Sequence, residues 1–276
     1  TSEEAVVQVK THVKNSATKN KNVAVSHEIW DGAQKIATVL SKKISIDGGS
    51  AAEDVSTLNV AKPKLWSPKS PSLYMLKTKV LVNGSVVDET ETRIGIRRFE
   101  IKKEGFFING EKLQLRGVNR HQDYPYVGYA LSNEAQYRDA VKIKEAGFDY
   151  VRLSHYPHSP AFMAACDELG LVVLDAILGW QYYSSDPQFQ KQIFQTSREL
   201  IRRDRNHACV IAWEVSLNES WMDEPFIDKL HAIAHQEYPG DQSYSAGWQE
   251  YGYDIYLQAR QHRLQHYSEP TKPYSV

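Results

Sequence analysis

At 276 residues the chain is long enough for two domains, and its 41% hydrophobic and 24% charged residues are typical of a globular protein. The formal net charge of -1 provides no field that would attract polyanions, so we expect no nucleic-acid partner. No apolar run approaches the roughly 18 residues that a membrane-spanning helix needs, so we expect no membrane partner either.

Both ends of the chain stop close to strand-like runs. The first residues, TSEEAVV, lack the basic and apolar segments of a signal peptide, and the last residues are KPYSV. We therefore expect a piece of a longer protein. Its compartment stays open, although the periplasm or the cell exterior would suit a parent that degrades polysaccharide.

Cys166 and Cys209 lie in no paired-cysteine motif and are expected to be buried thiols.

The first part of the chain reads as a series of strands. Apolar and polar residues alternate along residues 5–13, which is the period of a half-buried strand. Asp31-Gly32 and Asn83-Gly84 are strong turn signals, because these residues adopt a positive φ at low cost. Further strands are expected at residues 22–30, 35–46, 73–82 and 85–96. The pattern predicts an immunoglobulin-like β-sandwich over residues 1–98.

From Phe99 onward, a hairpin that turns at Asn109-Gly110 leads into alternating strands and helices. The expected strands are 113–119, 149–154, 171–177, 208–215, 243–248, 253–258 and 272–276. The expected helices are 133–146, with Asn133 and Gln136 as a capping box, then 161–169, 188–203, 225–238 and a stretch at 260–266. Alternation of this kind indicates a parallel sheet covered by helices. We expect residues 99–276 to form a (β/α)8 TIM barrel that is cut short near its seventh strand.

Polar residues follow three of these expected strands at their carboxyl ends, where such barrels carry their chemistry. Asn119-Arg120-His121, with Asp123 close behind, follows the first strand, and Ser154-His155 follows the second, which contains Arg152. Asn218-Glu219 follows the fourth. A single residue of this kind is more often structural, but three strands that end in this way favour a functional site.

Four segments of the chain resemble glycoside hydrolase family 2, the family of β-galactosidases, β-glucuronidases and β-mannosidases. They are LWSPKSPSLY (65–74), RGVNRHQDYP (116–125), DYVRLSHYPHSPAFMAACDELGLVVL (149–174) and RDRNHACVIAWEVSLNE (203–219). The resemblance implies a retaining exo-β-glycosidase without a cofactor, whose partner is a carbohydrate. A β-galactosidase is the first expectation, and a β-glucuronidase or a β-mannosidase is the alternative.

The resemblance also implies roles for individual residues. Glu219 corresponds to the acid/base carboxyl of the family, which must hold a proton near neutral pH. The residues expected to bind the substrate or to support the nucleophile are Asn218 (the sugar 2-hydroxyl), Arg152 (the charge of the nucleophile), His121, His155 and Asp123. A retaining glycosidase needs a second carboxyl about 5–5.5 Å from the first as its nucleophile.

That second carboxyl is expected outside the chain. Glu250, in WQEYGYD, looks like a family nucleophile, but it lies 250 − 219 = 31 positions after Glu219, which is a single strand-helix step. The family places its nucleophile at strand seven, so we expect it beyond Val276. We therefore rank Glu250 and Trp248 lower, as subsite residues, and expect the 276-residue chain alone to be inactive.

Two departures from the family pattern stand out. LDAILGWQYY has Ala176 after Asp175 and no nearby His, so no magnesium site is expected there. Glu214 stands where the family has a small residue, which is expected to change the loop without touching the Asn-Glu pair.

The helical pairs His231/His235 and His262/His266 lack the glutamate of a zinc-protease motif, so solvated helix faces are expected there.

A carbohydrate-binding or structural piece without turnover is the alternative from another class. A homo-oligomer of the parent also stays open.

Overall fold

The computed structural model describes residues 2–238, 243–257 and 274–275. The chain divides into two compact units, which consist of Thr1–Trp66 with Ser72–Ile96, and of Ser67–Pro71 with Arg97–Val276.

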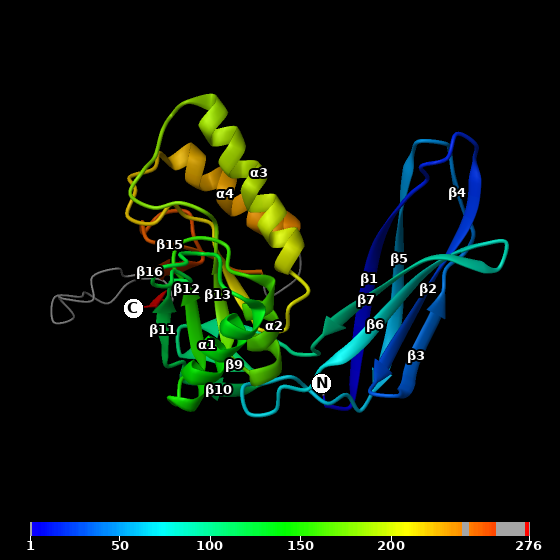
Figure 1. Ribbon diagram of the computed structural model, residues 1–276, viewed down its shortest axis with the longest axis horizontal. Helices are drawn as coiled ribbons and strands as arrows, with labels where there is room; N and C mark the ends of the chain where they lie inside the picture. The colour runs from blue at the N-terminus through cyan, green and yellow to red at the C-terminus, as the bar shows by residue number, and fades with distance from the viewer. Residues whose placement is uncertain (1, 239–242, 258–273, 276) are drawn as a thin grey trace. The chain divides into compact units, whose positions relative to one another are not determined.

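The first unit contains two antiparallel sheets (Figure 1). One pairs β1 (Glu4–Lys14) with β5 (Ala51–Ala61). The other has the order β3-β2-β6-β7, with β4 beside β2; its strands are β2 (Lys21–Asp31), β3 (Gln34–Leu40), β4 (Ile44–Ile46), β6 (Tyr74–Val82) and β7 (Ser85–Ile94). Ile29 and Leu76 from one sheet pack with Leu58 and Val60 from the other in one buried cluster. The unit is therefore a two-sheet β structure closed around an apolar core.

The turn predicted at Asn83-Gly84 is confirmed. Both residues have a positive φ, 51° and 82°, as a two-residue hairpin between β6 and β7 requires. The single strand expected over residues 35–46 is wrong, because the chain breaks into β3 and β4. No strand was expected at Ala51–Ala61, where β5 lies. Its buried face carries the polar residues Asp54 and Ser56, which interrupt the apolar alternation.

The second unit begins with a small antiparallel sheet formed by β8 (Phe99–Lys102), β9 (Gly105–Ile108) and β10 (Glu111–Leu113). A seven-stranded parallel sheet follows, in sequential order: β11 (Gly117–Arg120), β12 (Tyr150–Leu153), β13 (Val172–Ala176), β14 (Val210–Glu214), β15 (Ser245–Gly247), β16 (Ile255–Leu257) and β17 (Tyr274–Ser275). The expected parallel series is confirmed, including its seventh strand. The first strand of this series, expected over 113–119, begins only at Gly117, because Leu113 still belongs to the hairpin strand β10.

The helices of this unit are α1 (Asn133–Glu145), α2 (Pro160–Leu169), α3 (Pro187–Asp204) and α4 (Glu224–Glu237). The side chain of Ser132 caps α1, one residue before the cap expected at Asn133. Gly170 ends α2 in a left-handed conformation. The helical stretch expected at 260–266 lies outside the described residues.

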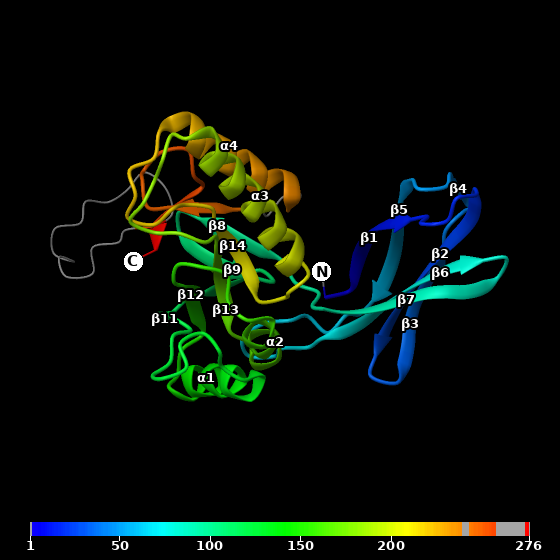
Figure 2. The same cartoon turned by 45° about the horizontal axis from the view of Figure 1, so that its top comes forward.

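The helices pack in pairs, α1 with α2 and α3 with α4, as both views show (Figures 1 and 2). The central strands β13 and β14 are buried along their whole length, so their side chains form the core. Because the strands run parallel, their carboxyl ends meet at one edge of the sheet. Among the described residues, no helix is both long and apolar enough to cross a membrane.

Candidate functional site

Asn218 is the centre of the polar cluster at the carboxyl ends of the strands. Its side chain is buried, and its Oδ1 accepts a hydrogen bond of 3.0 Å from Nη2 of Arg152. Its Nδ2 lies 3.4 Å from Nε2 of His155. Since Oδ1 is held by a guanidinium, the amide must present Nδ2 as its donor on the other side. The structure thus brings together three residues that the sequence assigned to one site.

Arg152 is held in turn by Glu214, the last residue of β14. Arg152 donates two bonds to the Glu214 carboxylate, 2.8 Å from Nε to Oε2 and 2.5 Å from Nη2 to Oε1. The Glu214 side chain has no exposed surface, and that of Arg152 is 9% exposed. Burial raises the pKa of the Glu214 carboxyl, and the charge of Arg152 opposes this shift. The expectation that Glu214 leaves the Asn-Glu pair untouched is wrong, because Glu214 anchors the guanidinium that binds Asn218.

Glu219 extends from the end of the same segment into solvent. Its φ is 54°, in the left-handed region that a glutamate rarely adopts. Nε2 of Gln181 donates a bond of 2.8 Å to its Oε2. The backbone of the β13–α3 loop also binds Asn218, since Gln181 N donates to Asn218 O and Asn218 N donates to Gly179 O. Strained residues supported in this way are concentrated at functional sites.

Aromatic rings and imidazoles surround this cluster. The ring centroids of His121 and His155 are 5.7 Å apart, and Trp180 lies 6.2 Å from the first and 5.9 Å from the second. Burial, followed by the charge of Arg152, lowers the pKa of His155 to about 3. His155 is therefore neutral at neutral pH and can donate one hydrogen bond and accept another. Trp180 is 39% exposed, so part of its indole ring is open to solvent.

The remaining predicted residues lie outside the hydrogen-bonded cluster. Asp123 is exposed in the turn after β11. Trp248 follows β15, packs edge-on against Trp221 with 4.9 Å between the ring centroids, and donates from Nε1 to the carbonyl of Ser220. Glu250 is exposed in the bend that follows. Trp248 thus contacts Ser220, the residue that directly follows Glu219.

Asp175 is poorly placed to bind a metal at this edge of the sheet. Its side chain is fully buried in β13, and its Oδ1 accepts from the backbone N of Ala176 at 2.9 Å. Burial raises the pKa of the Asp175 carboxyl well above its usual range, and the neighbouring Asp204 raises it further. A carboxyl whose charged form is disfavoured in this way is a weak ligand for a divalent cation.

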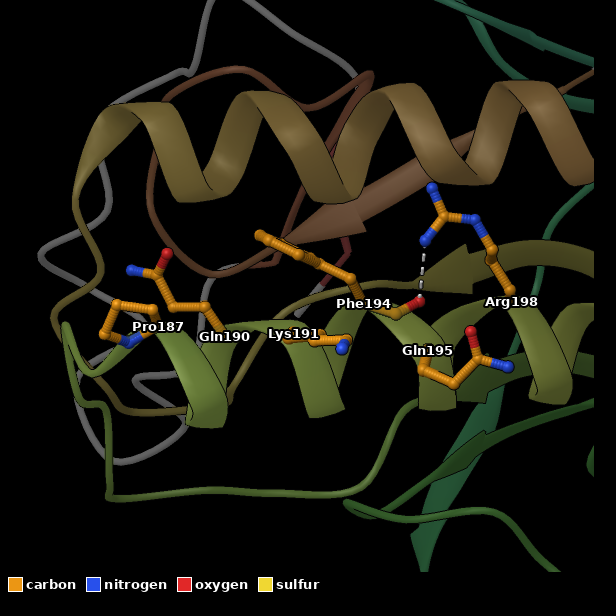
Figure 3. Close-up of a pocket in the computed structure, with 6 residues that line it drawn as sticks. All are labelled: Pro187, Gln190, Lys191, Phe194, Gln195 and Arg198. Atoms are coloured by element: carbon orange, nitrogen blue, oxygen red, sulfur yellow. Dashed lines mark hydrogen bonds between the residues drawn. The ribbon is translucent and has the colours of Figure 1, made fainter.

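A separate hollow lies along α3 (Figure 3). The residues that line it, all from this helix, are Pro187, Gln190, Lys191, Phe194, Gln195 and Arg198. None of them is a carboxylate, and none belongs to the cluster around Asn218. The strand-end cluster, with its buried charges and its exposed glutamate, is the better candidate for chemistry.

Comparison with known proteins identifies the family. The family model described as "Glycosyl hydrolases family 2, TIM barrel domain" matches residues 99–243, and a second, "Glycosyl hydrolases family 2", matches residues 1–97. The chain belongs to glycoside hydrolase family 2. The first unit therefore corresponds to the immunoglobulin-like domain of the family, and the second unit corresponds to its TIM-barrel domain.

Relatives within family 2 include enzymes of two sugar specificities. The chain is 39% identical over 236 residues to the β-galactosidase of Thermoanaerobacterium thermosulfurigenes, a match that covers 84% of the chain and 32% of that protein. A family 2 member from Bacteroides cellulosilyticus is 28% identical, with a TM-score of 0.81 over 90% of this chain and 33% of that one. The Bacteroides uniformis β-glucuronidase is 25% identical, with a TM-score of 0.81 over 95% and 33%. The chain thus spans about a third of the length of these relatives.

Sequence reasoning missed three residues of this site. Glu214 was noted only as a departure, and Trp180 and Gln181 were not singled out. Gln181 has a φ of 57° and binds both the side chain of Glu219 and the backbone of Asn218. Only its place in the loop beside a family motif could have indicated this role.

Proposed function

We propose that the intact protein is a retaining exo-β-glycosidase that removes terminal β-linked sugars, with β-galactosides as its first substrates. The observation that carries this proposal is the arrangement at the end of β14, where the exposed Glu219 adjoins an Asn218 held by Arg152 and His155. A proton donor beside a fixed amide donor suits a glycosidic oxygen next to a sugar 2-hydroxyl.

In this proposal Glu219 acts twice. It first gives its proton to the glycosidic oxygen, while a carboxylate nucleophile forms a bond to the anomeric carbon and the bond to the leaving group breaks. It then takes a proton from water, whose oxygen attacks the anomeric carbon and releases the enzyme carboxylate. Nδ2 of Asn218 donates to the 2-hydroxyl, and His121, His155 and Asp123 bind other hydroxyls of the sugar.

We place the nucleophile after the seventh strand of an eight-stranded barrel in the intact protein, three strands beyond Glu219. β17 is the seventh strand in the sheet order, which supports this placement. Glu250 follows the fifth strand and is assigned to a subsite, together with Trp248, whose ring packs on Trp221. The buried Arg152 would lie near the nucleophile, although Glu214 already balances its charge.

The β-galactosidase among the relatives is the basis for putting galactosides first, and the β-glucuronidase supplies the alternative. A set of aryl β-glycosides that differ only in the sugar decides between them. We expect the highest kcat/KM on β-galactosides; a higher value on β-glucuronides would replace the sugar but keep the reaction. Binding of a sugar without hydrolysis of any aryl glycoside would favour a carbohydrate-binding protein.

Glu219→Gln, with Glu250→Gln as the matched control, tests the acid/base assignment. Without the proton donor, glycosides with poor leaving groups should be hydrolysed far more slowly, whereas activated aryl glycosides need little protonation in the first step. The control variant should retain the selectivity of the original protein for leaving groups. Equal losses on both substrate types in Glu219→Gln would reject the assignment.

A further inference from the structure

We propose that His231, His235 and Asp254 form a binding site for one transition-metal ion, of the class of Zn²⁺, Co²⁺ or Ni²⁺, remote from the strand-end cluster. The two histidines stand one helical turn apart in the second half of α4, and Asp254 directly precedes β16. This site is independent of the proposed glycosidase activity, because it shares no residue with the polar cluster around Asn218.

The three side chains converge. The ring centroids of His231 and His235 are 4.5 Å apart, because residues four apart on a helix share one face. The Asp254 carboxylate faces both imidazoles: Oδ2 is hydrogen-bonded to Nε2 of His235 at 2.7 Å, and Oδ1 lies 4.0 Å from Nε2 of His231. Each residue offers one ligand atom, and the three ligand atoms all lie within 4.8 Å of one another.

Ion binding needs only small side-chain movements. An ion with bonds of about 2.0–2.2 Å holds adjacent ligand atoms about 3 Å apart, so the His235–Asp254 separation already fits. The His231 ring must approach by roughly 1 Å, which a rotation of the side chain provides. All three side chains are about a third exposed, at 31%, 36% and 33%, which leaves room for water to complete the coordination.

A buried residue orients two of the ligands. Ser245, which has no exposed surface in β15, contacts Nδ1 of His231 through its hydroxyl and donates its backbone N–H to Oδ2 of Asp254 at 3.1 Å. A hydrogen bond at Nδ1 directs Nε2 of the imidazole toward a metal, as in many natural sites. Ser245 therefore orients two of the ligands through hydrogen bonds, as the residues behind the ligands do in natural metal sites.

The ligand types select the class of ion. Two imidazoles and one carboxylate suit zinc, cobalt and nickel, whereas magnesium and calcium prefer oxygen ligands throughout. The other convergent group in the described part of the chain, Asp167 with His207 and Cys209, is less suitable. Asp167 and Cys209 have almost no exposed surface, at 1% and 0%, so water cannot complete the coordination of an ion there. Burial also raises the pKa of the Cys209 thiol well above its usual range, so the thiolate that binds metals is disfavoured.

A bound ion would join α4 to the segment between β15 and β16 at the end of the sheet opposite the strand carboxyl ends. We therefore expect a structural ion, whose release lowers thermal stability and leaves the rate of glycoside hydrolysis unchanged.

The test uses the intact protein after treatment with a chelator and dialysis. Zn²⁺ is added in a calorimetric titration, and Co²⁺ in a titration that follows its visible absorption. The variants are His235→Gln and Asp254→Asn, and the control is His12→Gln, whose side chain is 65% exposed in the first unit. Far-UV circular dichroism establishes that each variant is folded, and His231→Gln replaces any variant that is not.

We expect one Zn²⁺ or Co²⁺ per chain that is lost, or bound at least about tenfold more weakly, in both ligand variants but not in His12→Gln. Zn²⁺ should raise the Tm of the original protein and of the control, and it should leave the Tm of the ligand variants unchanged. Equal binding by the original protein and by His235→Gln would overturn the site. Absence of binding at about 100 µM Zn²⁺ would overturn it as well.

Discussion

Removal of the Glu214 carboxylate should destabilise the protein strongly, because it leaves the buried guanidinium of Arg152 without its counter-charge. The pair is bidentate, and the two side chains are 0% and 9% exposed, so water cannot replace the carboxylate. Loss of one partner of a buried ion pair costs about 3–5 kcal/mol. Two hydrogen bonds to a charged group, at about 1.5–3 kcal/mol each, give a similar sum.

Urea unfolding of Glu214→Ala, followed by tryptophan fluorescence, measures this loss in the free energy of unfolding. The matched control is Glu53→Ala, which breaks the exposed pair of Lys10 and Glu53, whose side chains are 57% and 36% exposed. An exposed pair contributes about 0–1 kcal/mol, so the control should remain near the original stability.

The double variant Arg152→Met/Glu214→Leu separates stability from positioning. With both charges gone, no charged group is left buried without a partner, so the stability should return to within about 1–2 kcal/mol of the original protein. The remaining loss comes from the buried Oδ1 of Asn218, which no longer has its donor. Its kcat/KM should stay low, because Asn218 has lost the donor that orients its amide. A loss below about 1 kcal/mol in Glu214→Ala would refute the reasoning, since it would mean that Arg152 reaches water or another carboxylate.

Two further predictions concern metal and pH. Hydrolysis by the intact protein should be unchanged in EDTA, because Asp175 is buried in β13 with Oδ1 bonded to the backbone and LDAILGWQYY offers no His beside it; a tenfold loss restored by Mg²⁺ would contradict this. Burial lowers the pKa of His158 to about 4, so between pH 6.5 and 4 the unfolded chain binds a proton at this residue that the folded chain does not, and stability falls as the pH falls. Between pH 6.5 and 5 this residue should account for about 1.6 kcal/mol of that loss. The free energy of unfolding in urea should therefore decrease less over this interval in His158→Gln than in the original protein; an equal decrease would show that His158 is not responsible.

The local features of the fold could be predicted from the sequence. Asn83-Gly84 specified a hairpin because both residues accept a positive φ, and Gly170 specified the end of α2 for the same reason. β5 could not be recognised in this way. Its Asp54 and Ser56 face the interior, where Asp54 accepts a bond from Ser56 and lies 3.4 Å from His27 of β2. A polar residue whose hydrogen-bond partner lies inside the core interrupts the alternation of apolar and polar residues. The sequence pattern alone therefore does not predict a strand there.

The candidate site could be located but not assembled from the sequence. The family motifs placed Arg152, His155 and Asn218 at strand ends, and the parallel register brings those ends together. The bond between Arg152 and Glu214 joins residues that are 62 positions apart on strands that are not neighbours in the sheet. No local pattern encodes such a contact, because it depends on how β12, β13 and β14 align.

The central claim is that Glu219 is the acid/base residue of a retaining glycosidase. The most direct test is the configuration of the sugar azide formed when Glu219→Ala acts on an activated aryl β-glycoside in the presence of azide. If Glu219 is the acid/base residue, azide attacks the glycosyl-enzyme intermediate in place of activated water, and NMR should show the β-glycosyl azide. An α-glycosyl azide would contradict the account, because it would mean that azide had replaced Glu219 as the nucleophile.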